Sequence, residues 1–299
     1  MGERYEVLTR MDKESDDAQW TLVEPDDSAE MNTDFPITTR SQALEPSDFG
    51  RRSLSASATF EESRRRREAA ASLIRQSQAK PAREVTLAVE RMDAHLVTFH
   101  DSDPSASEQY DQLAIMLISA ATERPIKRVL IASAQHGEGR TCVTLNLAGA
   151  LARARQRVLV VDSDLLRPSV LRLLGIDAEI GLAEVIARGL PAGSAAMRIL
   201  PYNFTVLSTR ARVENSAELL ASPALQELLH TFDPDYDFIL FDSPPLLATA
   251  DTRLLIRLTQ TTLLVIRQGK TSSAQMAQAI TPLTAEDIFG VVLNRAVPR

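Results

Sequence analysis

The chain has 299 residues, of which 44% are hydrophobic and 24% are charged, and its formal net charge is −7. The single cysteine, Cys142, excludes a disulfide framework, and no run approaches the ~18 consecutive apolar residues of a membrane-spanning helix. Because the first residues also lack a secretory signal pattern and the charge balance is acidic, we expect a cytoplasmic protein that does not bind nucleic acid.

The first 84 residues are predicted to form a disordered arm. Residues 1–60 carry 13 acidic and 6 basic side chains, and this polar composition offers too little apolar surface to offset the entropy of ordering. A basic linker follows over residues 61–80, with four consecutive arginines. We interpret it either as a solvated charged segment or as a patch for an acidic partner or anionic lipid. The predicted organisation is therefore an arm over residues 1–84 and a folded domain over 85–299.

Helical and strand patterns alternate from residue 85 onward. Residues 107–120 have apolar side chains at helical spacing, and residues 127–133 form a short apolar run typical of a buried parallel strand. Further helices are expected over residues 141–154, 218–230 and 272–283, and further strands over 157–162, 204–208, 238–242, 262–267 and 289–294. Strands that alternate with helices predict one α/β domain built on a doubly wound, mainly parallel sheet.

The turn after the first of these strands has the sequence AQHGEGRT, and we call these residues, 134–141, the phosphate loop. Its two glycines let backbone N–H groups converge on a phosphate, and the following helix adds the positive end of its dipole. The hydroxyl of Thr141 at the helix start is placed to bind Mg²⁺. Ala134 and Arg140 stand where the P-loop pattern GxxxxGK[ST] has glycine and lysine, so an ordinary strand-to-helix turn is the alternative.

Two acidic motifs come directly after later strands. Asp162-Ser163-Asp164 follows the run RVLVV, and Asp242-Ser243-Pro244-Pro245 follows the run FILF. Two carboxylates at the end of a buried strand repel each other unless a cation or a water-filled cleft relieves them. The alternative for Asp164 is an N-cap of the next helix. Because ligands of doubly wound sheets bind outside the carboxyl ends of the strands, the order of the three features favours a phosphate and metal site.

At these motifs the chain resembles the cytoplasmic tyrosine kinases of bacterial capsule and exopolysaccharide assembly, which are relatives of the MinD/ParA P-loop ATPases. The resemblance covers roughly residues 90–299 and rests on SEQY, SAQHGEGRT, VLVVDSDLLRP, NSAELLASPALQELL, YDFILFDSPPLLATAD and GVVLN. It implies that residues 85–299 form a P-loop kinase-like domain with ATP and Mg²⁺ as cofactors. It also implies a membrane-anchored polysaccharide co-polymerase as partner, a location at the inner face of the membrane and possible homo-oligomers.

The resemblance also implies roles for individual residues. The residues expected to bind the nucleotide are Gly137, Glu138, Gly139, Arg140, Thr141 and Cys142. The metal is expected on Thr141, Asp162 and Asp242, and the catalytic residues are expected to be Asp162, Asp164 and Arg140. A separate interpretation of Cys142 concerns its thiol, which is either a small buried group or, at a helix N-terminus, a redox-sensitive one with a lowered pKa.

The chain departs from the family at several of these motifs. Arg140 keeps the positive charge of the family's lysine but is a wider planar fork, so we expect nucleotide binding to persist and catalysis to weaken. In the family, the motif at Asp162-Ser163-Asp164 has the pattern Asp-x-Asp-x-Arg, and Leu166 stands here at the position of its arginine. Asp111 and Ala114 replace two arginines of the family's oligomerisation segment. The family's C-terminal tyrosine cluster is also missing. The tyrosines here are Tyr5, Tyr110, Tyr202 and Tyr236, so tail autophosphorylation is not expected.

Three functions follow as alternatives. The first is an ATP-dependent protein-tyrosine kinase-like ATPase that phosphorylates a partner and regulates polysaccharide polymerisation or export. The second is a catalytically degenerate, nucleotide-binding regulator of the same assembly, which the altered Arg140 and Leu166 favour. The third is a MinD/ParA-type positioning ATPase. Those proteins carry an extra lysine at the start of the loop, where this chain has Gln135, and this difference counts against the third alternative.

Overall fold

The structure is a computed structural model that describes residues 4–8, 65, 83–100 and 102–296. Most of the predicted disordered arm and of the basic linker lies outside the described residues. The described part of the arm, Arg4–Leu8, is strand β1, which pairs antiparallel with β9 at the edge of the sheet. Residues 83 and 84, the last two of the predicted arm, already belong to strand β2.

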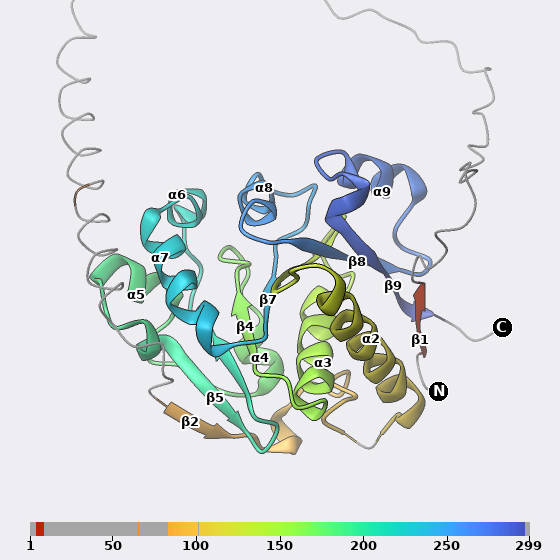
Figure 1. Ribbon diagram of the computed structural model, residues 1–299, viewed down its shortest axis with the longest axis horizontal. Coiled ribbons are helices and arrows are strands. Elements are labelled where there is room, and N and C mark those ends of the chain that lie inside the picture. Colours follow the sequence, from red (N-terminus) through yellow and green to blue (C-terminus); the bar gives the residue numbers. More distant parts are fainter. Residues whose placement is uncertain (1–3, 9–64, 66–82, 101, 297–299) are drawn as a thin grey trace, which may run out of the picture. The chain divides into compact units, whose positions relative to one another are not determined.

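The described strands form a nine-stranded sheet in the order β1-β9-β8-β3-β7-β4-β6-β5-β2. All neighbours run parallel except for β1 with β9 and β5 with β6, which are antiparallel. Figure 1 shows this sheet between its helices. The strands after β1 are β2 (Arg83–Thr86), β3 (Arg128–Ser133), β4 (Val158–Asp162), β5 (Ala196–Leu200), β6 (Phe204–Leu207), β7 (Phe238–Asp242), β8 (Thr261–Arg267) and β9 (Ile288–Ala296).

Helices cover both faces of the sheet. One face carries α2 (Pro104–Glu123), α3 (Arg140–Arg153) and α4 (Val170–Leu174), and Figure 1 shows α2 and α3 side by side. The other face carries α5 (Leu182–Arg188), α6 (Ser216–Leu220), α7 (Pro223–Phe232), α8 (Asp251–Ile256) and α9 (Ser273–Ile280). Short 3-10 turns are η1 (Val89–Arg91), η2 (Ala192–Ala195), η3 (Asp233–Asp235) and η4 (Ala285–Asp287).

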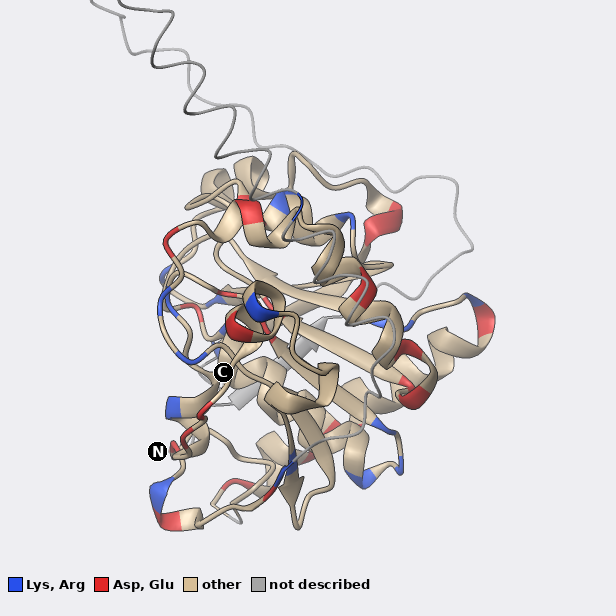
Figure 2. Cartoon of the chain, turned by 90° about the vertical axis from the view of Figure 1, so that its left-hand side faces the viewer, with Lys and Arg blue, Asp and Glu red and all other residues tan. Residues whose placement is uncertain are grey.

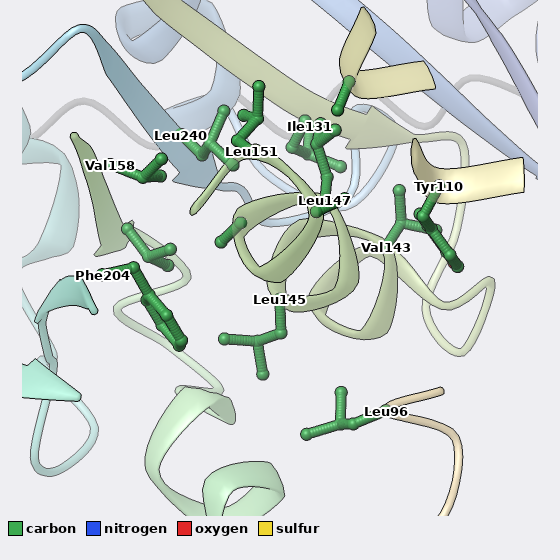
Figure 3. Packing of buried hydrophobic residues seen from close by; sticks show 14 of the residues in the cluster. Leu96, Tyr110, Ile131, Val143, Leu145, Leu147, Leu151, Val158, Phe204 and Leu240 are labelled. Atoms are coloured by element: carbon green, nitrogen blue, oxygen red, sulfur yellow. The ribbon is translucent and has the colours of Figure 1, made fainter. Parts of the chain in front are cut away.

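The strand side chains alternate between two buried cores. In β3, Val129 and Ile131 face the α2–α4 side, whereas Leu130 and Ala132 face the opposite side. Burial on both faces explains why β3 reads as a continuous apolar run. Figure 3 shows the first core, where Leu147 of α3 lies close to Ile131. This packing fixes α3 against the sheet and thereby places the phosphate loop at the carboxyl end of β3.

The predicted fold class is confirmed, since the sheet is mainly parallel and has helices on both faces. The six predicted strands and the helices over residues 107–120, 141–154 and 272–283 are present, with shifted ends. The single helix predicted over residues 218–230 is wrong, because the chain forms α6 and α7 instead. Pro223 lacks a backbone N–H and begins α7, and the Ser222 side chain accepts a hydrogen bond from the backbone N–H of Leu225.

Acidic and basic residues are interspersed over the described elements, as Figure 2 shows. Within the described ranges, every helix is too short or too polar to cross a lipid bilayer.

Candidate functional site

The phosphate loop connects the end of β3 to the start of α3. Gly137 and Gly139 adopt φ values of 75° and 97°, the left-handed region that favours glycine. A Cβ atom on Gly139 would lie 1.9 Å from the Nδ2 atom of Asn294, so the backbone approaches β9 too closely for any side chain. The first turn of α3 contains no acidic residue. The loop therefore presents a helix N-terminus that suits an anion.

Glu138 braces the phosphate loop from inside the protein. Its side chain is buried, and its carboxylate accepts a hydrogen bond of 2.8 Å from the backbone N–H of Gln135 and another from the Thr271 hydroxyl. The amide Nδ2 of Asn294 donates to the backbone carbonyl of Glu138 at 2.8 Å. Glu138 thus supports the loop and is absent from the cavity wall described below.

The segment after β8 holds the outer side of the same loop. The guanidinium of Arg267 donates to the Gly137 carbonyl at 3.0 Å, and the ammonium of Lys270 donates to the His136 carbonyl at 2.6 Å. These contacts engage the backbone carbonyls of His136 and Gly137, so the loop is also held from the β8 side.

Arg140 commits much of its guanidinium to the protein. The Nε atom donates to the Ser243 carbonyl at 2.8 Å, and Nη1 donates to the Gln135 carbonyl at 2.7 Å and to the Ser133 hydroxyl. Its Nη2 atom lies 3.8 Å from the Asp164 carboxylate. Burial lowers the pKa of the guanidinium, although nearby carboxylates oppose this shift. Arg140 therefore connects the phosphate loop to both acidic motifs, through Ser243 of one and Asp164 of the other.

Thr141 and Asp242 are in direct contact. The Thr141 hydroxyl donates to the Asp242 carboxylate at 2.7 Å and lies 2.7 Å from the Ser169 hydroxyl. The Thr144 hydroxyl lies 3.4 Å from the other oxygen of Asp242. Burial raises the pKa of Asp242 to about 6, although the hydrogen bond from Thr141 opposes the shift.

Asp162 lies opposite Asp242 in the register of β4 and β7. Its Oδ2 atom accepts hydrogen bonds of 3.2 Å from the backbone N–H groups of Ser169 and Val170. Its Oδ1 atom is buried and has no hydrogen-bond partner within the described residues. Burial, followed by the charge of Asp242, raises the pKa of Asp162 well above its usual value. The structure thus brings Thr141 into contact with Asp242 and places Asp162 beside Asp242 on the neighbouring strand, and their binding of a metal stays a prediction.

Asp164 lies between two arginines. Its Oδ1 atom accepts a hydrogen bond of 3.0 Å from the backbone N–H of Arg167, and its Oδ2 atom faces Arg140. Burial raises the pKa of Asp164, and the charge of Arg140 acts in the opposite direction. The N-cap alternative for Asp164 is not observed, since α4 begins after Ser169.

A cavity of about 340 Å³ lies against the phosphate loop. The loop side of its wall includes His136, Gly137, Gly139, Arg140, Thr141 and Cys142. Asp164, Arg167, Ser169 and Arg172 contribute the wall that follows β4. Asp162 and Asp242 do not line this cavity, and they lie buried behind Thr141.

Nine residues of the wall were not assigned to the site from the sequence, and four of them come from segments far from the predicted motifs. Asp93 and His95 come from the segment before α2, and Asn294 and Arg295 come from the end of β9. Asn294 belongs to the motif GVVLN, which could have pointed to it. Asp93 is placed by its backbone N–H, which donates to the Leu173 carbonyl at 2.9 Å, and no local pattern encodes such a contact.

Cys142 lines the cavity and is half-buried. Burial, with the charges of Asp93 and Asp242, raises the pKa of its thiol to about 12. The redox-sensitive interpretation, which requires a lowered pKa, therefore does not apply.

The residues present fit a nucleotide with Mg²⁺. Gly137 and Gly139 line the cavity and leave the loop backbone without side chains at these two positions. Within the described part of the chain, no cluster of three His, Cys, Asp or Glu side chains could hold a metal ion alone. Mg²⁺, however, is commonly held by one or two protein oxygens together with phosphates and waters. The adjoining oxygens of Thr141 and Asp242 match that mode.

Comparisons with known proteins show which family this chain resembles. Residues 125–297 match the ParA family, described as NUBPL iron-transfer P-loop NTPase. The tyrosine-protein kinase YwqD of Bacillus subtilis (strain 168) is 31% identical over 206 residues, which cover 68% of this chain and 87% of that protein. The tyrosine-protein kinase etk of Escherichia coli (strain K12) is 29% identical over 197 residues, which cover 65% of this chain and 27% of that protein.

Among solved structures, the kinase domain of Escherichia coli tyrosine kinase ETK matches with a TM-score of 0.63 and 28% identity. The match covers 70% of this chain and 84% of that one. The match to YwqD extends over most of that relative, and the ParA match covers more than half of this chain. The chain therefore belongs to the bacterial tyrosine-protein kinases, a group of ParA-like P-loop NTPases.

Proposed function

We propose that the protein is an ATP- and Mg²⁺-dependent protein-tyrosine kinase-like ATPase that regulates exopolysaccharide or capsule polymerisation and export. One observation carries the proposal: Thr141 donates to Asp242, and Asp162 lies opposite Asp242 in the strand register, all beside the phosphate loop. Relatives that are named tyrosine-protein kinases support the reaction class.

The reaction requires three tasks from this chain. The N–H groups of the phosphate loop would hold the β- and γ-phosphates, and the helix dipole of α3 would favour their charge. Thr141 and Asp242 would hold Mg²⁺, which neutralises charge that develops on the transferred group. Asp162 would accept the proton of the attacking tyrosine hydroxyl, as the family resemblance implies, and this role requires its buried Oδ1 atom to become accessible when the substrates bind. Asp164 would orient this region through its contacts with Arg140 and Arg167.

The phosphate acceptor is proposed to be a tyrosine on another protein. Tyr110 and Tyr236 are buried, with 1% and 6% of their surface exposed. The hydroxyl of Tyr202 donates to the Phe99 carbonyl at 3.1 Å. Tyr110 and Tyr236 thus serve the fold, because a buried side chain does not reach the site of another copy, and the hydroxyl of the half-buried Tyr202 is bound to the backbone.

A nucleotide-binding regulator with weak catalysis is the second candidate, and the contacts of Arg140 favour it. Because its Nε and Nη1 atoms donate to protein oxygens, this arginine has fewer donors for a phosphate than a lysine at the same position. Both candidates place the protein in the cytoplasm at the inner face of the membrane, docked to a membrane-anchored polysaccharide co-polymerase. The resemblance to the capsule kinases supports this partner, and possible homo-oligomers rest on it as well.

Phosphotransfer decides between the two candidates. The test measures Mg²⁺-dependent phosphorylation of a Glu/Tyr copolymer by the wild type and by the Asp162→Asn and Arg140→Lys variants. For the kinase, we expect activity in the wild type, its loss in Asp162→Asn, and higher turnover in Arg140→Lys because a compact ammonium leaves its donors to the phosphates. Nucleotide binding without transfer in the wild type and in Arg140→Lys would leave the regulator as the function.

A further inference from the structure

A cation other than Arg140 is available to the phosphates of the nucleotide, and this inference rests on the proposed function. Arg140 is only 7% exposed, and the contacts described above direct its Nε and Nη1 atoms to oxygens of Ser133, Gln135 and Ser243. Its remaining nitrogen faces the Asp164 carboxylate. The guanidinium of Arg140 thus mainly stabilises the phosphate loop through contacts within the protein. The negative charge of a triphosphate therefore requires a further cation.

Arg167 also lines this cavity. It lies in the loop between β4 and α4, and its side chain is exposed. Its backbone N–H donates to the Asp164 carbonyl at 3.1 Å and to the Asp164 carboxylate at 3.0 Å, so the root of the side chain is fixed. Within the described residues, the structure shows no hydrogen bond from the Arg167 guanidinium to the protein. Its five donors therefore remain available to a ligand.

The charge of Arg167 acts on a residue of the phosphate loop, His136. His136 belongs to the phosphate loop, and burial lowers the pKa of its imidazole. Among the charges that lower this pKa further, that of Arg167 acts most strongly, ahead of those of Arg140 and Lys270. The charge of Arg167 therefore acts on His136 of the phosphate loop, and both residues line the same cavity.

The other arginines of the wall are directed elsewhere. The charge of Arg172 acts on Asp93 and Cys142, and the charge of Arg295 acts on Cys142. The arginine charges that act on His136 are those of Arg167 and Arg140, and neither Arg172 nor Arg295 is among them.

We propose that Arg167 is the principal phosphate-binding cation of this site and takes over the role that the phosphate-loop lysine has in the P-loop pattern. Its ligand is the di- or triphosphate group of a nucleotide seated on the phosphate loop. A planar guanidinium binds phosphate oxygens in bidentate fashion, which suits a group that reaches across the cavity.

The test titrates full-length protein with ADP and with adenosine by calorimetry, for the wild type and for Arg167→Gln, Arg167→Lys and Arg188→Gln. Arg188 is an exposed arginine at the end of α5, outside the cavity, and serves as the matched control. We expect Arg167→Gln to weaken ADP binding about tenfold or more, because a charge-assisted contact is lost. We expect Arg167→Lys to weaken it less and Arg188→Gln to leave it unchanged.

Two further readouts separate a phosphate contact from a structural role. Adenosine affinity should be the same in wild type and Arg167→Gln, because adenosine has no phosphate. Added salt should weaken ADP binding less in Arg167→Gln than in the wild type, because one charge pair fewer is screened. Wild-type affinity for ADP in Arg167→Gln, or an equal loss for ADP and adenosine, would overturn the inference alone. A wild type that binds no ADP would overturn the proposed function with it.

Discussion

The two buried carboxylates, Asp162 and Asp242, determine the electrostatics of the site. They end neighbouring parallel strands, and each is at most 1% exposed. Hydrogen bonds from Thr141 to Asp242 and from two backbone N–H groups to Asp162 offset only part of the cost of burying two like charges. A divalent cation beside them would offset more, so we interpret this cost as a property of a site built to bind a metal.

This cost predicts a pH dependence of stability in metal-free protein. Because the folded-state pKa of Asp242 is raised from 3.8 to about 6, its contribution to stability is complete below pH 4 and is lost as the pH rises through about 6. Asp242→Asn removes this pH-dependent loss of stability, because an amide does not ionise. We expect the unfolding free energy of the variant relative to that of the wild type to rise by about 2 kcal/mol between pH 4.5 and pH 7.5, measured by urea denaturation with EDTA.

Asp237 provides a control of opposite sign. Its ion pair with Arg157, at 2.6 Å, lowers the pKa of its carboxyl, so its contribution is lost only in more acidic solution. The difference between Asp237→Asn and the wild type should therefore stay nearly constant between pH 4.5 and pH 7.5. An Asp242→Asn variant that behaves in the same way would contradict our account of the buried carboxylates.

At the scale of elements, the phosphate loop is held between α3 and β9. Gly139 needs a positive φ and touches Asn294, so Gly139→Ala combines backbone strain with a collision. Gly269 also has a positive φ, of 71°, but nothing lies within 4 Å of the position of its Cβ atom. We expect Gly269→Ala to cost about 1 kcal/mol and Gly139→Ala about 3 kcal/mol, measured by thermal or urea unfolding. Equal costs would show that β9 does not restrict the loop.

The sequence could predict the elements that carry local patterns and could not predict those fixed by distant contacts. Asp162 and Asp242 end apolar strands of the same parallel sheet, so their proximity follows from the fold class. The Ser222-Pro223 pair that divides α6 from α7 is also a local signal, and the prediction of one helix overlooked it. Strand β5 was not predicted either, because the exposed Arg198 interrupts its apolar run, although the three-residue connection to β6, in which Asn203 has a positive φ, is typical of a hairpin.

The residues that line the cavity were even harder to predict from the sequence, because contacts between distant segments bring them together. Asp93 and His95 reach it because the segment before α2 lies against α4, where the backbone N–H of Asp93 meets the Leu173 carbonyl. The contacts of Arg140 with Ser133, Gln135 and Ser243 likewise depend on three segments that meet only in the folded chain. Sequence patterns could suggest that Arg140 is charged and near phosphates, but not that its donors are already bound.

At the scale of the whole molecule, the two cores hold the carboxyl ends of β3, β4 and β7 side by side, and the phosphate loop with both acidic motifs emerges there. The central claim is that these three strand ends form one site for a nucleotide and Mg²⁺. Calorimetric titration of the wild type with ADP, with and without Mg²⁺, tests it most directly, and Asp242→Asn provides the comparison. We predict that ADP binds, that Mg²⁺ tightens binding several-fold, and that Asp242→Asn abolishes the effect of Mg²⁺. No heat of binding with ADP in either condition, or an effect of Mg²⁺ that persists in Asp242→Asn, would contradict the account.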